Sequence, residues 1–160
     1  MIKEFQPVKE GVAFLVKEWL PILSSLSEDD ITIKKNSQNR SVKQILGHLI
    51  DSVSNNTHRV IHLQYQESPI SFPNYASNGN NDRWIAIQNY QGECWPNMLE
   101  LWKHMNLHYI HIIDCIDPTK LNQQWYYSGG KLISLKEMVI DYLRHLELHI
   151  NEIRKLMEQT

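Results

Sequence analysis

The sequence has little net charge and no long apolar run, and each shortage excludes a class of protein. Its 160 residues include 16 Lys and Arg against 18 Asp and Glu, so a formal charge of −2 gives no general attraction to nucleic acid or anionic membrane. No apolar stretch approaches the roughly 20 residues of a membrane-spanning helix. The N-terminus, MIKEFQPVKEG, lacks the apolar centre of a signal peptide. We therefore expect a cytoplasmic protein with neither nucleic-acid nor membrane partners.

Cysteine is also scarce. Cys94 and Cys115 are far apart in sequence and form no C-x-x-C pattern, so we expect two reduced thiols without a structural role. What the chain does have is 42% hydrophobic residues, eight histidines and five tryptophans. Its length and composition are sufficient for a core, and they predict one globular domain over residues 1–160.

Four apolar stripes with a helical period predict four amphipathic helices. They cover residues 4–26, 41–65, 95–116 and 134–157. Two of them begin with capping-box patterns, Ser41-Val-Lys-Gln44 and Ser134-Leu-Lys-Glu137, in which each side chain satisfies a free backbone donor. We find neither convincing strands nor an internal repeat. The sequence therefore predicts an all-α, antiparallel-type four-helix bundle with long connecting loops.

The connecting segments carry fewer signals. Residues 27–40 show no apolar period and are predicted to be a plain connector. Residues 66–92 are rich in Asn, Ser, Gly and Pro, and connections longer than roughly 15 residues are often functional lids. We expect a short helix near residues 82–90 to carry Trp84 and Tyr90 over the end of the bundle. The glycines that end the stretch 125–130 are typical of a tight turn.

A polar stripe borders the apolar face of the helix at 41–65. It contains His48, Ser52, Asn55 and Arg59, at spacings of four, three and four residues. Such a stripe either lines a cleft or marks the boundary between core and solvent, and four residues in register favour a cleft. Asn55 and Arg59 are then suited to orient or neutralise an anionic substrate. Their commoner role is that of surface residues or of hydrogen-bonding partners for a loop.

The last helix contains His145 and His149, which stand one turn apart on one side. A step of about 100° per residue places His149 inside the apolar arc and His145 at its edge, whereas Glu147 points to nearly the opposite side. The pattern therefore differs from the H-E-x-x-H helix of metalloproteases, whose glutamate shares the side of the metal. Imidazoles that face a core need partners, either a metal ion or ordinary hydrogen bonds.

The remaining histidines are less suited to a shared site. Five of the eight lie outside or at the edge of the apolar faces of their helices: His58, His62, His104, His108 and His111. His48, His145 and His149 remain, from two independently capped helices. Three neutral imidazoles can hold one ion and leave a coordination position open, as in catalytic zinc sites.

These motifs resemble the DinB-like superfamily of metal-dependent four-helix bundles, which is also described as YfiT-like. Ser41-Val-Lys-Gln-Ile-Leu-Gly-His48-Leu-Ile-Asp-Ser52 is similar to the helix that carries the first metal ligand of the family. His145-Leu-Glu-Leu-His149-Ile-Asn-Glu-Ile153 is similar to its H-x-x-x-H helix. The likeness covers nearly the whole chain. It implies a metal triad of His48, His145 and His149, with zinc, nickel or another divalent ion, in a cytoplasmic and often dimeric protein.

The resemblance implies several functions. Some members are thiol-S-transferases that use low-molecular-weight thiols such as bacillithiol or mycothiol, one is an isomerase, and many have no assigned reaction. We favour a homodimeric metalloenzyme that acts on a small-molecule substrate, either as a hydrolase using metal-bound hydroxide or as a thiol transferase using metal-bound thiolate. The alternative is a non-catalytic bundle, stapled by its metal, that acts as a binding or scaffold protein in a stress response. Exposed aromatic surface around Trp84 and Trp125 would favour this alternative, and an open metal position in a pocket would favour catalysis.

No carboxylate from the two ligand helices is predicted to act as a dedicated base. Glu147 points away from the histidines, and periodicity places Asp51 and Glu152 toward the solvent-facing flanks of their helices. We therefore expect the metal itself to generate the nucleophile by lowering its pKa.

Overall fold

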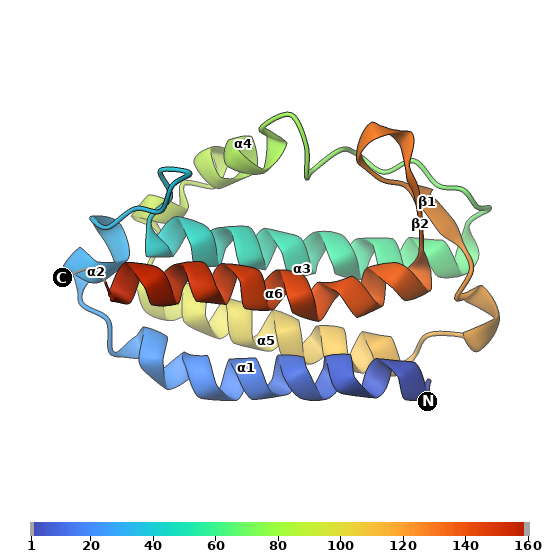
Figure 1. Cartoon of the computed structure of the whole chain (residues 1–160), viewed down its shortest axis with the longest axis horizontal. Coiled ribbons are helices and arrows are strands. Elements are labelled where there is room, and N and C mark those ends of the chain that lie inside the picture. Colours follow the sequence, from blue (N-terminus) through green and yellow to red (C-terminus); the bar gives the residue numbers. More distant parts are fainter. Residues whose placement is uncertain (1, 159–160) are drawn as a thin grey trace.

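Four long helices form a bundle in the computed structural model of the protein, which describes residues 2–158 (Figure 1). They are α1 (Gln6–Ser24), α3 (Val42–Tyr65), α5 (Trp95–Asp114) and α6 (Leu135–Met157). A 3-10 turn, Lys3–Phe5, precedes α1. The four predicted helices are thus confirmed to within two residues at each end. Among the described residues no helix is both long and apolar enough to cross a membrane.

Serine caps determine where three helices begin. Ser41 and Ser134 each accept a hydrogen bond from a backbone N–H three residues later, and the side chain of that residue accepts one from the serine backbone. Both predicted capping boxes are therefore confirmed. Ser27 forms a third box with Asp30 and starts a short helix, α2 (Glu28–Thr32). The prediction of a plain connector from residue 27 is wrong at its start, because a five-residue helix is too short to show a helical period.

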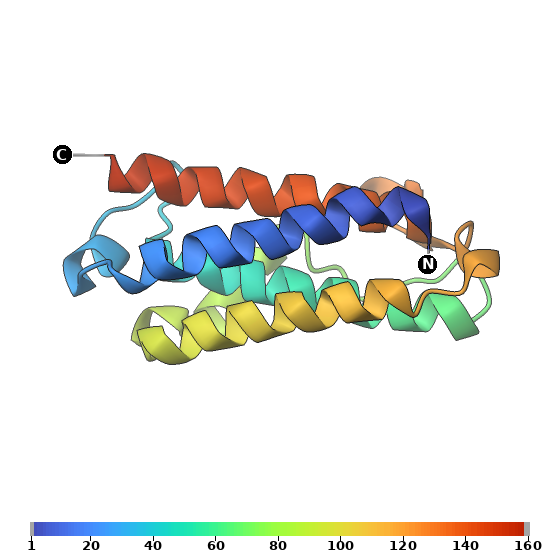
Figure 2. The same ribbon diagram turned by 90° about the horizontal axis from the view of Figure 1, so that it is seen from below.

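The direction of the helices differs from the antiparallel expectation. α3 packs against α5 and α6, and α1 packs against the same two helices. In Figures 1 and 2, α3 and α5 run in the same direction, and α1 and α6 run in the opposite one. The neighbours α3 and α5 are therefore parallel. A parallel pair needs a long return between its members, and residues 66–94 supply that return.

A small hairpin closes one end of the bundle and corrects the prediction that strands are absent. β1 (Gln124–Tyr126) pairs antiparallel with β2 (Leu132–Ser134), and Ile70 forms a parallel bridge to Trp125. Three-residue strands are too short to show alternation in the sequence. Gly129 and Gly130 turn the chain with φ of 72° and 79°, a conformation that favours glycine, as the tight-turn prediction expects.

The long connection is fastened to α3. It contains α4 (Asn80–Ile87) and a 3-10 turn (Tyr90–Gly92), close to the predicted short helix. Tyr90 is buried against α3 at Gly47, where any Cβ would overlap the ring of Tyr90. The connection is therefore held against the helix that carries His48, and it runs along the bundle rather than only over its end (Figure 1).

Candidate metal centre

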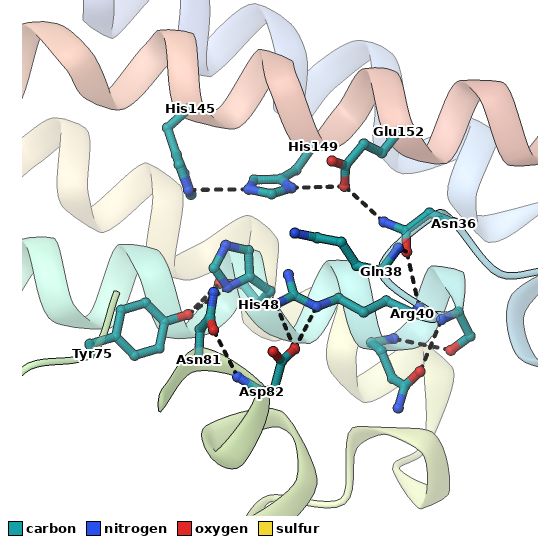
Figure 3. Close-up of polar contacts among 12 residues, drawn as sticks. Asn36, Gln38, Arg40, His48, Tyr75, Asn81, Asp82, His145, His149 and Glu152 are labelled. Carbon is teal, nitrogen blue, oxygen red and sulfur yellow. Dashed lines mark hydrogen bonds and ion pairs between the residues drawn. The ribbon is translucent and has the colours of Figure 1, made fainter. Parts of the chain in front are cut away.

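The three histidines singled out from the sequence meet between α3 and α6. One possible ligand nitrogen from each of His48, His145 and His149 lies within 4.8 Å of the others. The Nε2 atoms of His145 and His149 are 3.2 Å apart, and the ring centres of His48 and His149 are 4.5 Å apart. Because α3 and α6 lie side by side and each exposes these positions to the other, two separate helices contribute to one cluster (Figure 3).

Each histidine uses its other ring nitrogen for a hydrogen bond within the protein. Nδ1 of His149 lies 3.0 Å from Oε2 of Glu152, and a carboxylate can only accept, so this nitrogen carries the proton. Nδ1 of His48 lies 2.7 Å from the hydroxyl of Tyr75, which also donates to the His48 carbonyl at 3.3 Å. In both rings the contact at Nδ1 leaves Nε2 for the cluster.

His145 is positioned in a comparable way. Its Nδ1 lies 3.3 Å from the hydroxyl of Ser52, which is one turn beyond His48 on α3. The amide of Asn56 in turn donates to the backbone carbonyl of Ser52 at 2.8 Å. Such partners fix the orientation of a ligating ring and are a regular feature of protein metal sites.

The cluster is electrostatically suited to a cation. Burial, followed by the charges of His149 and His145, lowers the pKa of His48 to about 2. Burial and the charge of His149 lower the pKa of His145 to about 4. Both rings are therefore neutral at physiological pH, and their lone pairs remain available. Three imidazole nitrogens that converge within ligand distance fit a divalent metal ion.

Two carboxylates occupy positions that helical periodicity predicts wrongly. Glu152, expected on the solvent flank of α6, is partly buried and binds both His149 and the amide of Asn36 at 3.2 Å (Figure 3). Burial raises its pKa, but the hydrogen bond from His149, aided by Asn36 and Arg40, outweighs this effect and leaves the pKa lowered. The residues that bury Glu152 come from the 27–40 segment, whose path the periodicity of α6 cannot reveal.

Asp51 is the second such carboxylate. It is 2% exposed and accepts hydrogen bonds from Tyr90 (2.8 Å) and Gln88 (2.6 Å), both from the long connection. Burial raises its pKa to about 6, although these two hydrogen bonds oppose the shift. Glu147, by contrast, is exposed as predicted. Asp51 thus anchors the long connection to α3.

An open pocket of about 760 Å³ lies over the cluster. The three histidines line it together with side chains from the hairpin and from the two connecting segments, among them Gln38, Arg40 and Asn81 (Figure 3). Arg40 is 4% exposed and forms an ion pair of 2.6 Å with Asp82 of α4. This pair joins the 27–40 segment to the 66–92 connection across the pocket rim. The expectation that the long connection covers a site agrees with this arrangement.

The four residues of the predicted polar stripe do not all face the pocket. His48, Ser52 and Arg59 line it, but Asn55 does not, and Asn56 takes its place. The amide of Asn55 instead donates to the backbone carbonyl of Asp51 at 2.9 Å. Positions seven and eight residues after His48 differ by only about 100° around the helix, and the sequence offers no means of choosing between them. Tyr75, the partner of His48, was missed because it lies in a loop without periodic signal.

The other histidines form no further group of three ligands among residues 2–158. The rings of His58 and His62 are tilted by 53° with centres 4.1 Å apart, but Nδ1 of His62 is bound to the hydroxyl of Tyr65 at 2.7 Å. His104 lies on the surface 3.2 Å from Glu100. Cys94 and Cys115 are free and exposed.

Comparison with known proteins supports the fold more than the reaction. No protein-family model and no curated protein sequence matches the chain. Among solved structures, the chain is similar to YfiT from Bacillus subtilis, described as a probable metal-dependent hydrolase with an unusual four-helix-bundle topology. The TM-score is 0.84 at 17% identity, over 99% of this chain and 89% of YfiT.

A second similar structure is a mycothiol-dependent maleylpyruvate isomerase. The TM-score is 0.74 at 10% identity, and the match covers 96% of this chain but only 63% of the isomerase. A histidine-to-alanine mutant of the isomerase matches equally well. The chain therefore has the YfiT-like four-helix-bundle fold that its motifs resemble.

Proposed function

We propose that the protein is a metal-dependent enzyme that acts on a small molecule, either as a hydrolase or as a transferase that uses a low-molecular-weight thiol. The observation that carries this proposal is the convergence of three histidines in the wall of an open pocket. A purely structural ion is normally enclosed by four protein ligands, whereas catalytic sites keep a position open. The descriptions of the two similar structures, one a probable hydrolase and the other a thiol-dependent isomerase, support the same class.

In this proposal His48, His145 and His149 hold a zinc or nickel ion, which as a Lewis acid lowers the pKa of a water or thiol in the pocket. Tyr75, Ser52 and Glu152 orient the three rings through Nδ1. These contacts keep the ligand nitrogens directed at one point before any ion arrives, which reduces the cost of binding.

The pocket offers no free carboxylate as a base among its described lining residues. Glu137 accepts hydrogen bonds from the backbone and hydroxyl of Ser134, and Asp141 is bound to Arg144 at 2.6 Å. Glu152 is engaged by His149 and Asn36. The proton of the nucleophile therefore leaves through the open pocket to solvent, and no side-chain base is required.

The scaffold alternative finds less support. Trp125 is 5% exposed and Trp84 is 39% exposed, and the exposed aromatic surface next to Trp125 comes from Tyr126 (45%) and Tyr127 (40%). A metal ion with a purely structural role does not need an open pocket of about 760 Å³ over its ligands. The pocket therefore favours catalysis over partner binding.

The test begins with the metal content of protein purified from its native host, followed by a thiol-conjugation and ester-hydrolysis screen on that metal-loaded protein. We expect activity that disappears on chelation, returns with added ion and rises with pH through one ionisation. The midpoint of that ionisation should shift when zinc is replaced by nickel. Activity that is indifferent to both chelator and metal identity would contradict the proposal.

A further inference from the structure

Arg59 is a buried cation that has no counter-ion among residues 2–158. It lies on α3 three turns beyond His48, is 7% exposed, and lines both the main pocket and an adjoining cavity of about 120 Å³. Its Nε is sealed from solvent and has no hydrogen-bond partner among the described residues. The other two arginines of the pocket, Arg40 and Arg144, are paired with Asp82 and Asp141. Arg59 therefore differs from these two arginines, because no acidic side chain among the described residues pairs with it.

Among the described residues, no carboxylate is found in the surroundings of Arg59. Its guanidinium carbon lies 4.3 Å from the ring centre of Trp125, whose own indole Nε1 is also buried without a partner. Burial lowers the pKa of Arg59, and the groups that oppose this shift are the hydroxyls of Tyr75, Tyr127 and Tyr109 rather than carboxylates. Arginine stays protonated in proteins even so. One end of the pocket thus carries a positive charge that no acidic side chain in the described part of the chain compensates.

A buried guanidinium without an ion pair lowers the free energy of unfolding unless a bound anion pairs with it. Buried charges in folded proteins are nearly always paired, and the contact with Trp125 offsets only part of the desolvation. A guanidinium presents its donors in a planar fork that matches the two oxygens of a carboxylate or phosphate. A carboxylate or phosphate on a bound ligand would therefore supply the partner that Arg59 lacks.

The position of Arg59 also restricts the shape of that ligand. Eleven residues of α-helix separate it from His48, which corresponds to about 16 Å between the two Cα atoms. The pocket lining includes the aromatic and apolar side chains of Tyr75, Trp125 and Ile133, and also polar Ser52 and Asn56 from α3. A molecule that spans this distance would have its anionic group at one end and a body with apolar or aromatic parts.

We propose that Arg59, backed by Trp125, forms an anion-binding subsite for a small substrate that carries a carboxylate or phosphate at the end remote from the histidines. The inference deepens the proposed function by naming a substrate class, and it rests on that function only for the reacting end of the molecule. Anion binding at Arg59 can be measured whether or not the histidines hold an ion.

The experiment titrates the full-length protein calorimetrically, once with its metal and once after removal of the metal with EDTA. The probes are benzoate and phenyl phosphate, which distinguish the two anion types, and benzamide, which has a similar shape without charge. The test variant is Arg59→Met, which keeps the length of the side chain and removes its charge. The matched control is Arg154→Met, because Arg154 also lies over a tryptophan, 5.2 Å from the ring centre of Trp19, but outside the pocket.

We expect Arg59→Met to weaken binding of the preferred anion roughly ten- to a hundredfold in both forms of the protein, the loss expected for charged hydrogen bonds. Benzamide affinity and zinc stoichiometry should not change, and Arg154→Met should bind like wild type. The melting temperature of Arg59→Met should equal or exceed that of wild type, because Met removes an unpaired buried charge. A failure of zinc binding with intact anion binding would count against the proposed function alone.

The proposal is overturned if wild type binds benzoate and phenyl phosphate no better than benzamide, or if Arg59→Met binds them like wild type. A large drop in melting temperature with unchanged anion affinity would identify Arg59 as a structural residue instead. If Arg59→Met does not fold, Arg59→Gln is titrated in its place, and the same two outcomes decide.

Discussion

Glu152 and His149 form a hydrogen-bonded pair, with Oε2 3.0 Å from Nδ1, on the side of the imidazole that faces away from His145 (Figure 3). The pair determines which nitrogen of His149 carries the proton, and it leaves Nε2 for the cluster. Because Asn36 holds the same carboxylate oxygen, the orientation of the ring depends on a segment more than a hundred residues earlier in the chain.

The substitution Glu152→Gln is therefore expected to weaken zinc binding by about ten- to a hundredfold, the range found for such supporting residues. The amide keeps the size of the side chain but loses the charge that favours a ring proton on Nδ1. Competition with a chromophoric chelator measures the affinity. Glu147→Gln, on an exposed position of the same helix, is the control and should bind zinc like wild type. Equal affinities for the two variants would show that Glu152 does not orient His149.

Replacement of any one of His48, His145 and His149 by Ala should reduce metal occupancy sharply, because two neutral imidazoles hold a divalent ion weakly. His104→Ala and His111→Ala should keep full occupancy, since both side chains are exposed on α5. Elemental analysis of the purified variants gives the stoichiometry. The assignment is wrong if the cluster variants keep their metal while the His104 variant loses it.

Asp51 should make the protein less stable as pH rises. Because it is buried, its carboxyl has a pKa of about 6 in the folded protein, raised from the ordinary value of 3.8. The folded state therefore holds this proton more tightly, and the resulting stability is complete below about pH 4 and is lost as pH rises through about 6. Between these limits wild type should lose roughly 1–3 kcal/mol of unfolding free energy from this group.

Asp51→Asn removes that loss, so the difference in unfolding free energy between variant and wild type should shift in favour of the variant from pH 4 to pH 8. Urea denaturation at a series of pH values measures it. The exposed Asp29→Asn variant serves as the control for a general change in charge. Parallel pH curves for wild type and Asp51→Asn would refute the prediction.

Gly47→Ala tests how the long connection is held. A Cβ at this position would overlap the ring of Tyr90, which cannot easily move because its hydroxyl is bound to Asp51. We expect a loss of roughly 1–3 kcal/mol in urea denaturation, as is typical of overpacking. Gly11→Ala is the matched control. There the Cβ would meet the branched end of the half-buried Leu143 side chain, which can rotate away, and alanine gains up to about 1 kcal/mol of helix propensity. A Gly47→Ala protein as stable as Gly11→Ala would mean that Tyr90 gives way.

The sequence by itself determined the helices and the inward direction of the three histidines. Ser41 and Ser134 mark helix starts through bonds within four residues, and a period of 3.6 residues places His48, His145 and His149 relative to the axes of their own helices. Both are local properties, so they can be read without knowing the path of the chain.

Tertiary structure alone decided what each helix face meets. Periodicity places Glu152 and Asp51 on outer flanks, yet Asn36 and Tyr90 bury them, since the connecting segments fold back over α6 and α3. Tyr75 reaches His48 from a loop, and Trp125 lies over Arg59 from a strand of three residues. These contacts join residues from 27 to 116 positions apart, and a helical period specifies an angle around one axis but not which distant segment packs against it.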